Sequence, residues 1–312
     1  MLLNWFHWMD KNMVYHDKRK LDEIITLIKL EPTLSCIYVE GPTDKRIIEK
    51  FICQIGLNNI NVYSIDTIDF SQLYPDKPFL IDNNKEKAIE LSMQLDKLVD
   101  EKSRKIMCVV DKDFDDLLGS FPTNRFLYRT DFTCMEMYTF NIPCLDHFIN
   151  NVLFGFPIEP EIIISEIGKV LIELFFIRYA ISILFTKQME YDYIDVKKVC
   201  VIDKDCGEIQ FNKNEYLYRM LNKLEEISRK REYEVLIIDI TRKCTSDIRN
   251  YIHGHDYIHL LSIYIKRIKN IELKNEDILN RILFLCLDFK ELIQYQLFKN
   301  IILRFSSATP AC

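Results

Sequence analysis

Two short stretches decide the fold of this chain, CIYVEGPTDKR over residues 36–46 and KIMCVVDKD over residues 105–113. Each contains a continuous apolar run that is too short for a typical helix and is typical of a strand buried in a parallel sheet. The first run ends at Glu40, and the second ends at Asp111 and Asp113. Because ligands of open α/β sheets bind beyond the carboxyl ends of the strands, these acids are the first candidates for a functional site.

Helix-like and strand-like patterns alternate around these stretches up to about residue 140. The spacing of apolar residues predicts helices over 17–30, 45–55 and 85–99, and strands over 36–39, 62–65, 105–110 and 125–128. We expect Thr43 or Asp44 to cap the second helix. The alternation predicts an α/β fold, a parallel sheet with helices on its faces.

From about residue 145 the pattern becomes mainly helical. Helices are expected over 161–189, 213–232, 246–269 and 276–305, and a β-hairpin near 198–211 with Gly207 in its turn. We therefore predict a domain of residues 1–145, with an N-terminal helix and the parallel sheet. A mainly helical domain of residues 146–312 would follow and contact a partner, a second copy or a substrate.

The composition limits the class of protein. With 312 residues, 48% of them hydrophobic, the chain can bury a large core, which excludes general disorder. The net charge of −6 argues against a generally basic nucleic-acid binder but permits a local basic face. Ten cysteines without a C-x-x-C pair, and an N-terminus without a signal-peptide pattern, predict reduced thiols in a cytoplasmic protein.

The most apolar stretch, residues 162–185, is expected to be a core helix and not a membrane span. It contains Glu166, Lys169, Glu173 and Arg178. Each charge would cost about 2.5–3.5 kcal/mol at the centre of a bilayer. We expect no membrane contact.

The acids at the strand ends predict a metal site. Converging carboxylates repel one another, and a divalent cation removes that cost. Mg²⁺, or Mn²⁺ in its place, takes oxygen ligands. Asp111 and Asp113, at positions i and i+2 of a strand end, are expected to point to the same side, so that both carboxylates can reach one ion. Glu40 could hold a second ion or take a proton from an attacking water. The implied chemistry is phosphoryl transfer or phosphodiester cleavage, and a solvated loop is the competing interpretation.

The same residues resemble a known family. The stretches IYVEGPTDK (37–45) and VVDKD (109–113) are similar to the two signature motifs of the Toprim domain, which occurs in topoisomerases, primases, recombination proteins and OLD-family nucleases. The segments RTDFTCME (129–136) and IHGHD (252–256) resemble a subgroup of Toprim effectors that includes the AriB-like effectors of the PARIS anti-phage system.

The resemblance implies an effector nuclease that is held by an ATPase partner and cleaves host tRNA when released. It implies that Glu40, Asp111 and Asp113 are catalytic and that these three bind Mg²⁺ together with Glu136. No nucleotide-binding loop is present in the sequence, because Pro42 removes a backbone donor from the only Gly- and Lys-containing candidate. ATP hydrolysis would therefore belong to the partner.

Several assignments stay open at this level. Lys45, Arg46 and His255 are candidate substrate contacts, with a solvated surface as the alternative. The cluster His253, His255 and His259 has residue types that bind zinc, but a polar helix start or an RNA- or partner-binding surface is favoured, and Arg249, Lys266, Arg267 and Lys269 flank it. Asp115 or Asp116 could replace Glu136. The second Asp-Lys-Asp, at residues 203–205, is interpreted as a hairpin turn.

Three functional hypotheses remain. The first is the tRNA nuclease with an ATPase partner. The second is a DNA nuclease of the OLD type, and the third is a binding subunit of an ATPase complex with a degenerate Toprim domain. A homodimer is an additional alternative that the sequence does not decide.

Overall fold

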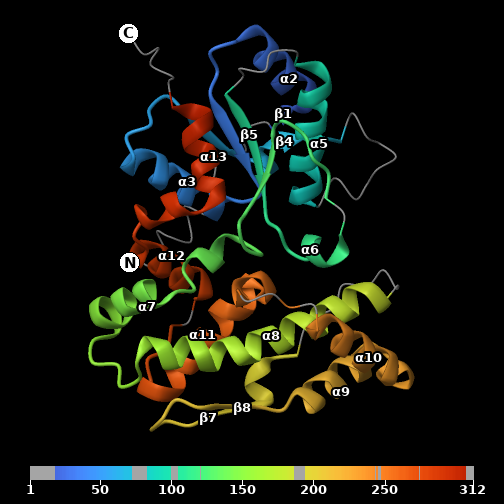
Figure 1. Cartoon of the computed structure of the whole chain (residues 1–312), viewed down its shortest axis with the longest axis vertical. Helices are drawn as coiled ribbons and strands as arrows, with labels where there is room; N and C mark the ends of the chain where they lie inside the picture. Colours follow the sequence, from blue (N-terminus) through green and yellow to red (C-terminus); the bar gives the residue numbers. More distant parts are fainter. Residues whose placement is uncertain are drawn as a thin grey trace, which may run out of the picture. The chain divides into compact units, whose positions relative to one another are not determined.

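The computed structural model describes residues 18–71, 83–99, 105–119, 121–185, 194–242, 244, 247–273 and 275–306 (Figure 1). The chain forms two compact units. Unit 1 comprises Met1–Val110, Pro122–Tyr128 and Asn300–Cys312, and unit 2 comprises Asp111–Phe121 and Arg129–Lys299. These units differ from the division at residue 145 because segments 129–145 and 300–306 pack with chain that is distant in sequence.

A four-stranded sheet forms the centre of unit 1. Its order is β3-β2-β5-β6, with β2 (Cys36–Val39) and β5 (Ile106–Val110) in the middle. β2 runs parallel to both β3 (Asn61–Ser64) and β5, and Val39 is in register with Ser64 and Val109. Every residue of β2 and β5 is buried. The predicted parallel sheet is thereby confirmed, and β6 (Leu127–Arg129) matches the predicted fourth strand.

Helices cover both faces of this sheet. The connections β2–β3 and β3–β5 cross the sheet in opposite directions, so right-handed crossovers place α3 (Pro42–Gln54) and α5 (Asn84–Leu98) on opposite faces. Figure 1 shows α3 on one side and α5, with α2 (Leu21–Leu30), on the other. A short parallel pair, β1 (Arg19–Lys20) and β4 (Ile68–Asp69), forms a separate two-stranded sheet in this unit. The one-turn helix η1 (Ile65–Thr67) directly precedes β4.

The start of α3 corrects one prediction. The N-cap is Gly41, and neither Thr43 nor Asp44 takes that position. Pro42 suits the first helical turn because it has no N–H to leave unpaired. Asp44 instead accepts a hydrogen bond from the backbone N–H of Gly41 at 3.0 Å, which closes the turn that follows Glu40.

Unit 2 is mainly helical, with α8 as its longest helix. Two of the predicted continuous helices, over 213–232 and 276–305, were wrong, and so was the one over 246–269, where the extended residues Ile252 and His253 separate η6 (Ile248–Tyr251) from α11 (Gly254–Lys269). The first is interrupted after α9, where Glu225 has a left-handed φ of 60°, and the second after α12, where the Asp288 side chain accepts the N–H of Lys290 at 2.9 Å. The elements are α6 (Asp115–Leu118), η2 (Met135–Tyr138), α7 (Ile142–Phe148), η3 (Ile149–Leu153), α8 (Pro160–Leu184), η4 (Val196–Lys198), β7 (Cys200–Ile202), β8 (Ile209–Phe211), α9 (Lys213–Lys223), η5 (Ile227–Arg229), α10 (Lys230–Thr241), η6 (Ile248–Tyr251), α11 (Gly254–Lys269), α12 (Glu276–Cys286) and η7 (Glu291–Gln294). The last helix, α13 (Gln296–Phe305), begins in unit 2, and its residues from Asn300 on belong to unit 1.

The most apolar stretch of the sequence forms α8, which is largely buried. The four charged residues in its apolar stretch are paired: Glu166 with Lys169, Glu173 with Lys213, and Arg178 with Asp256. The helix ends at Leu184, with Phe185 in extended backbone as its C-cap, so it is shorter than the predicted range of 161–189. Among the helices that are described, none has the length and apolar character needed to cross a membrane.

The hairpin at β7 and β8 confirms the interpretation of the second Asp-Lys-Asp. The strands are antiparallel, and Gly207 has a φ of 75° in the connection. The Asp203 carboxylate accepts the backbone N–H groups of Asp205 at 2.8 Å and Cys206 at 3.0 Å. This is an Asx-type turn, so Asp203 serves the backbone.

Candidate functional site

Glu40 follows directly on the last residue of β2. It is half-buried, and its backbone carbonyl accepts hydrogen bonds from the Asn84 side chain at 2.9 Å and the Ser64 hydroxyl at 3.4 Å. The residue is therefore held by groups from α5 and β3. Lys45 lies at the start of α3 and pairs with Glu49 at 3.7 Å, while Arg46 is exposed.

The Asp-Lys-Asp loop departs from strand geometry as soon as β5 ends at Val110. Asp113 has a left-handed φ of 46°, a conformation that Asp tolerates better than most residues. The Lys112 N–H donates to the Thr130 hydroxyl at 3.0 Å, and the Asp113 N–H donates to the carbonyl of Thr133 at 2.8 Å. Because β5 ends at Val110, the strand geometry from which we predicted that Asp111 and Asp113 point to one side does not extend to these residues.

The side chain of Lys112 fixes the same loop from within. Its ammonium donates to the Asn250 side chain at 2.8 Å and pairs with Asp116 at 2.8 Å. Burial would raise the pKa of Asp116, but Lys112 and Arg129, which lies 3.1 Å away, lower it below its usual value. Asp115 also lies 4.0 Å from Arg129. Asp116 therefore forms ion pairs with two side chains of the protein, Lys112 and Arg129.

An aromatic anchor holds the loop against α8. Phe114 packs on Phe175 and Tyr179, with ring centroids 4.9 and 5.4 Å apart. The Tyr179 hydroxyl donates to the carbonyl of Leu117 at 3.4 Å. These contacts give the acidic loop a rigid support.

Glu136 lies against the N-terminus of α11. A Cβ added to Gly254 would come within 2.7 Å of a Glu136 carboxylate oxygen and within 2.7 Å of the Cys134 sulfur. The Asn280 amide donates to the other Glu136 oxygen at 3.3 Å. Burial raises the pKa of the Cys134 thiol well above its usual value, and the charges of Glu136 and Asp111 add to this. Asp111 and Glu136 therefore both act on one buried thiol of unit 2.

His253, the N-cap of α11, brings a further group to the same place. Burial lowers its pKa, Arg178 and His255 act in the same direction, and Asp256 and Asp113 oppose them. Its Nδ1 atom is buried and has no hydrogen-bond partner among the described residues. The ring centroid of the exposed His255 is 5.5 Å away.

An ion pair braces the start of α11. The Arg178 guanidinium binds both carboxylate oxygens of Asp256, with the Nε–Oδ2 distance at 2.5 Å, and each side chain is only 12% exposed. The Thr133 hydroxyl also donates to the backbone carbonyls of Ile252 and, at 3.3 Å, Arg249. The segment 252–256 is thereby tied to both α8 and the segment that follows β6.

The three histidines of the cluster at 253–259 differ in their surroundings. The two ring nitrogens of His259 are hydrogen-bonded to Glu276 at 2.6 Å and to Asp195 at 3.3 Å. Neither His253 nor His255 takes part in these bonds. Within the described ranges, no three His, Cys, Asp or Glu residues are grouped so that they could hold a metal ion.

The acids nevertheless fit Mg²⁺ in kind. Mg²⁺ usually takes only one or two protein carboxylates and completes its shell with water and substrate phosphates. Asp111 and Glu136 are carboxylates of this kind in unit 2, and the charges of both raise the pKa of the Cys134 thiol. Glu40 follows the end of β2, whose neighbour β5 leads directly into Asp111.

Sequence reasoning missed four residues of this region: Lys112, Cys134, Arg178 and Asn280. The signal that could have found Lys112 is its position inside the Asp-Lys-Asp motif. The other three carry no local signal, because their roles arise from contacts between distant helices. Comparison with models of known families gives no match to the chain, and no curated protein matches it.

Proposed function

We propose that the chain is a Mg²⁺-dependent endonuclease of the Toprim type that cleaves structured RNA, with tRNA as the substrate. In this proposal it is a cytoplasmic effector of an anti-phage system, held inactive by an ATPase partner. Mn²⁺ would serve in place of Mg²⁺. The resemblance of residues 37–45 and 109–113 to the Toprim motifs supports the class, and the position of the acids after neighbouring parallel strands supports the roles.

One observation carries the proposal. β2 and β5 are neighbours in a parallel sheet, and Val39 is in register with Val109. Glu40 and Asp111 are the acids that follow the carboxyl ends of these two strands. This is the edge at which open α/β sheets bind their ligands.

The protein groups divide into three roles. Glu40 is assigned the proton transfer from the attacking water, and Asp111 and Asp113 are assigned to metal binding with support from Glu136. Lys45, Arg46 and His255 are assigned to the phosphates of the substrate. Lys112 is a positioning residue, because its bonds to Asn250 and Asp116 fix the loop between the two aspartates.

A bound Mg²⁺ would polarise the scissile phosphate and lower the pKa of its bound water. The acidic residues would hold this ion, while the anchor of Phe114 on α8 keeps the loop that carries them in one conformation. Rigid support matters because small displacements of catalytic groups are costly to the rate.

The test is cleavage of total tRNA by the purified full chain, with Mg²⁺ or with EDTA. Glu40→Gln keeps the size of the side chain and removes the charge, so we expect cleavage to fall by about a hundredfold or more. Glu31→Gln, an exposed acid at the end of α2, is the matched control and should cleave like the parent. Equal cleavage by Glu40→Gln and the parent would defeat the site assignment.

A second candidate, the degenerate binding subunit, is favoured by the absence of a three-residue metal group in the described ranges. Toxicity that persists with Asp111→Ala, in cells that also express the ATPase partner, would support it. Relaxation of plasmid DNA without loss of tRNA would instead support an OLD-type DNA nuclease.

A further inference from the structure

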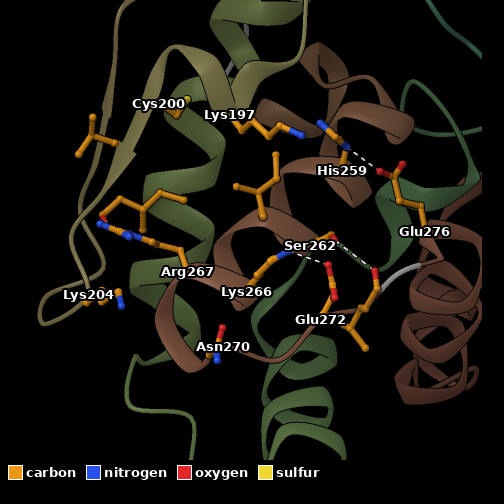
Figure 2. A pocket seen from close by; sticks show the side chains of 14 residues that line it. Lys197, Cys200, Lys204, His259, Ser262, Lys266, Arg267, Asn270, Glu272 and Glu276 are labelled. Carbon is orange, nitrogen blue, oxygen red and sulfur yellow. Dashed lines mark hydrogen bonds and ion pairs between the residues drawn. The ribbon is translucent and has the colours of Figure 1, made fainter.

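A separate pocket of about 750 Å³ lies in unit 2 between the β7–β8 hairpin and the C-terminal half of α11 (Figure 2). Its volume is in the range of small-molecule sites. Four cationic side chains line it, against two carboxylates, in a chain whose net charge is −6. The cations are Lys197, Lys204, Lys266 and Arg267, and the carboxylates are Glu272 and Glu276.

The two carboxylates already have cationic partners. Glu272 pairs with Lys266 at 2.6 Å, and Glu276 binds His259 at 2.6 Å. Burial alone would lower the pKa of His259, but hydrogen bonds and charge from Glu276 and Asp195 raise it above its usual value. Figure 2 shows both carboxylates at the side of the pocket away from Arg267 and Lys204.

The opposite side keeps positive charge. In the part of the chain that the structure describes, neither Lys204 nor Arg267 has a carboxylate within ion-pair distance. Arg267 donates from Nε to the backbone carbonyl of Ile202 at 3.2 Å, which orients the guanidinium without neutralising it. The charge of Arg267 acts on Asp203, whose carboxylate accepts two backbone N–H groups of the turn.

The end of α11 does not cancel this charge. The C-terminus of a helix carries about half a negative elementary charge, which is small beside two full positive charges. Lys269, also in the last turn, donates hydrogen bonds to the backbone carbonyls of Leu153 and Phe154 at the end of η3. Lys204 and Arg267 remain as cations with vacant donors for an anion.

The remaining lining is of mixed character. Val201, Ile263 and Leu273 give it an apolar wall, and Ser262 and Asn270 add hydrogen-bonding groups. A ligand that matches this surface has one strongly anionic group, a less polar body and a few hydroxyl or amide groups. A nucleotide has these features.

We propose that this pocket binds a phosphate-bearing nucleotide, either free or within an RNA strand, with Lys204 and Arg267 contacting the phosphate. The inference does not depend on catalysis by the acidic loop, because it concerns binding alone. Arg suits the phosphate because its planar guanidinium can make two parallel hydrogen bonds.

The test is equilibrium binding to the purified full chain in EDTA, which stops metal-dependent cleavage. The probes are adenosine monophosphate, adenosine as the control without phosphate, and a fluorescent eight-nucleotide single-stranded RNA. We expect at least one phosphate-bearing probe to bind, with adenosine about tenfold weaker than adenosine monophosphate where the latter binds. Binding of the monophosphate alone identifies a free nucleotide, and binding of the RNA alone identifies a strand.

The variants are Lys204→Gln with Arg267→Gln, and Arg242→Gln with Lys299→Gln as the matched control on exposed side chains outside the pocket. The pocket pair should weaken binding about tenfold or more, and the control should not change it. For the RNA, each lost phosphate contact should reduce the salt slope by about 0.7.

Because Arg267 also holds a backbone carbonyl, Lys204→Glu provides a variant at an exposed turn position where folding is not at stake. Thermal melting followed by circular dichroism establishes that each variant is folded. Absence of binding by both phosphate probes would overturn the proposal. Unchanged affinity in folded Lys204→Glu and in the folded pocket pair would overturn it as well.

Discussion

The ion pair of Arg178 and Asp256 gives the sharpest prediction about stability. Removing one partner of a buried pair leaves the other charge uncompensated and costs about 3–5 kcal/mol. Both side chains are 12% exposed, so some water reaches them and we take the lower limit, about 3 kcal/mol, for Asp256→Asn. With a urea m-value of about 3 kcal/mol/M, the unfolding midpoint should fall by about 1 M.

The double variant Arg178→Met with Asp256→Leu should recover most of this loss, because it removes both desolvated charges. Recovery should be incomplete by about 0.3–1 kcal/mol, since Asp256 also lies in the first turn of α11, where a carboxylate is favourable. The matched control is Asp239→Asn, which breaks an exposed pair with Arg242 at 3.6 Å and should cost less than about 1 kcal/mol.

Urea unfolding followed by both circular dichroism and fluorescence measures these midpoints, and agreement of the two probes tests for a single transition. The reasoning is refuted if Asp256→Asn moves the midpoint no further than Asp239→Asn. It is also refuted if the double variant is as unstable as the single one.

Two further predictions concern the hairpin and His259. Gly207→Ala should cost about 3 kcal/mol in urea unfolding, because φ is 75° and the new Cβ would lie 2.2 Å from the Tyr264 hydroxyl, which donates to the Gly207 carbonyl at 2.9 Å. Gly119→Ala has a similar φ of 69° but open space, so its cost should stay near 1 kcal/mol; equal losses would contradict the steric argument. The raised pKa of His259 means that its ion pairs stabilise the fold fully below about pH 6.5 and lose this effect as pH rises through the higher pKa of the folded state. Unfolding midpoints of the parent and His259→Gln should therefore differ at pH 5.5 and converge by pH 8.5, and a difference independent of pH would rule this out.

The sheet could be predicted from the sequence because its strands have a strong local signal. β2 matches the predicted range of 36–39, and β5 differs from the predicted range only at its first residue. The helical half was predicted less well at its breaks. Apolar spacing continues through residues 223–230 and 286–296, whereas the breaks depend on Glu225 and on the Asp288 side chain.

The candidate site divides in the same way. Glu40, Asp111 and Asp113 could be found because they follow predicted strands. The approach of Glu136 to Gly254 could not, because it depends on how η2 and α11 pack. The partners Arg178 and Asp256 are 78 residues apart, and neither lies in a local sequence pattern that predicts the other.

Unit 1 combines residues from the beginning and the end of the sequence, and this has a consequence for biosynthesis. Lys105 donates from its ammonium to the carbonyl of Phe305 at 3.2 Å, and Arg304 donates to the carbonyl of Arg125 and lies over the Phe126 ring at 5.5 Å. A ribosome must therefore translate past residue 305 before the strand-bearing unit has all its contacts. A nascent chain that stops earlier, at residue 145 for example, would emerge with that unit unfinished.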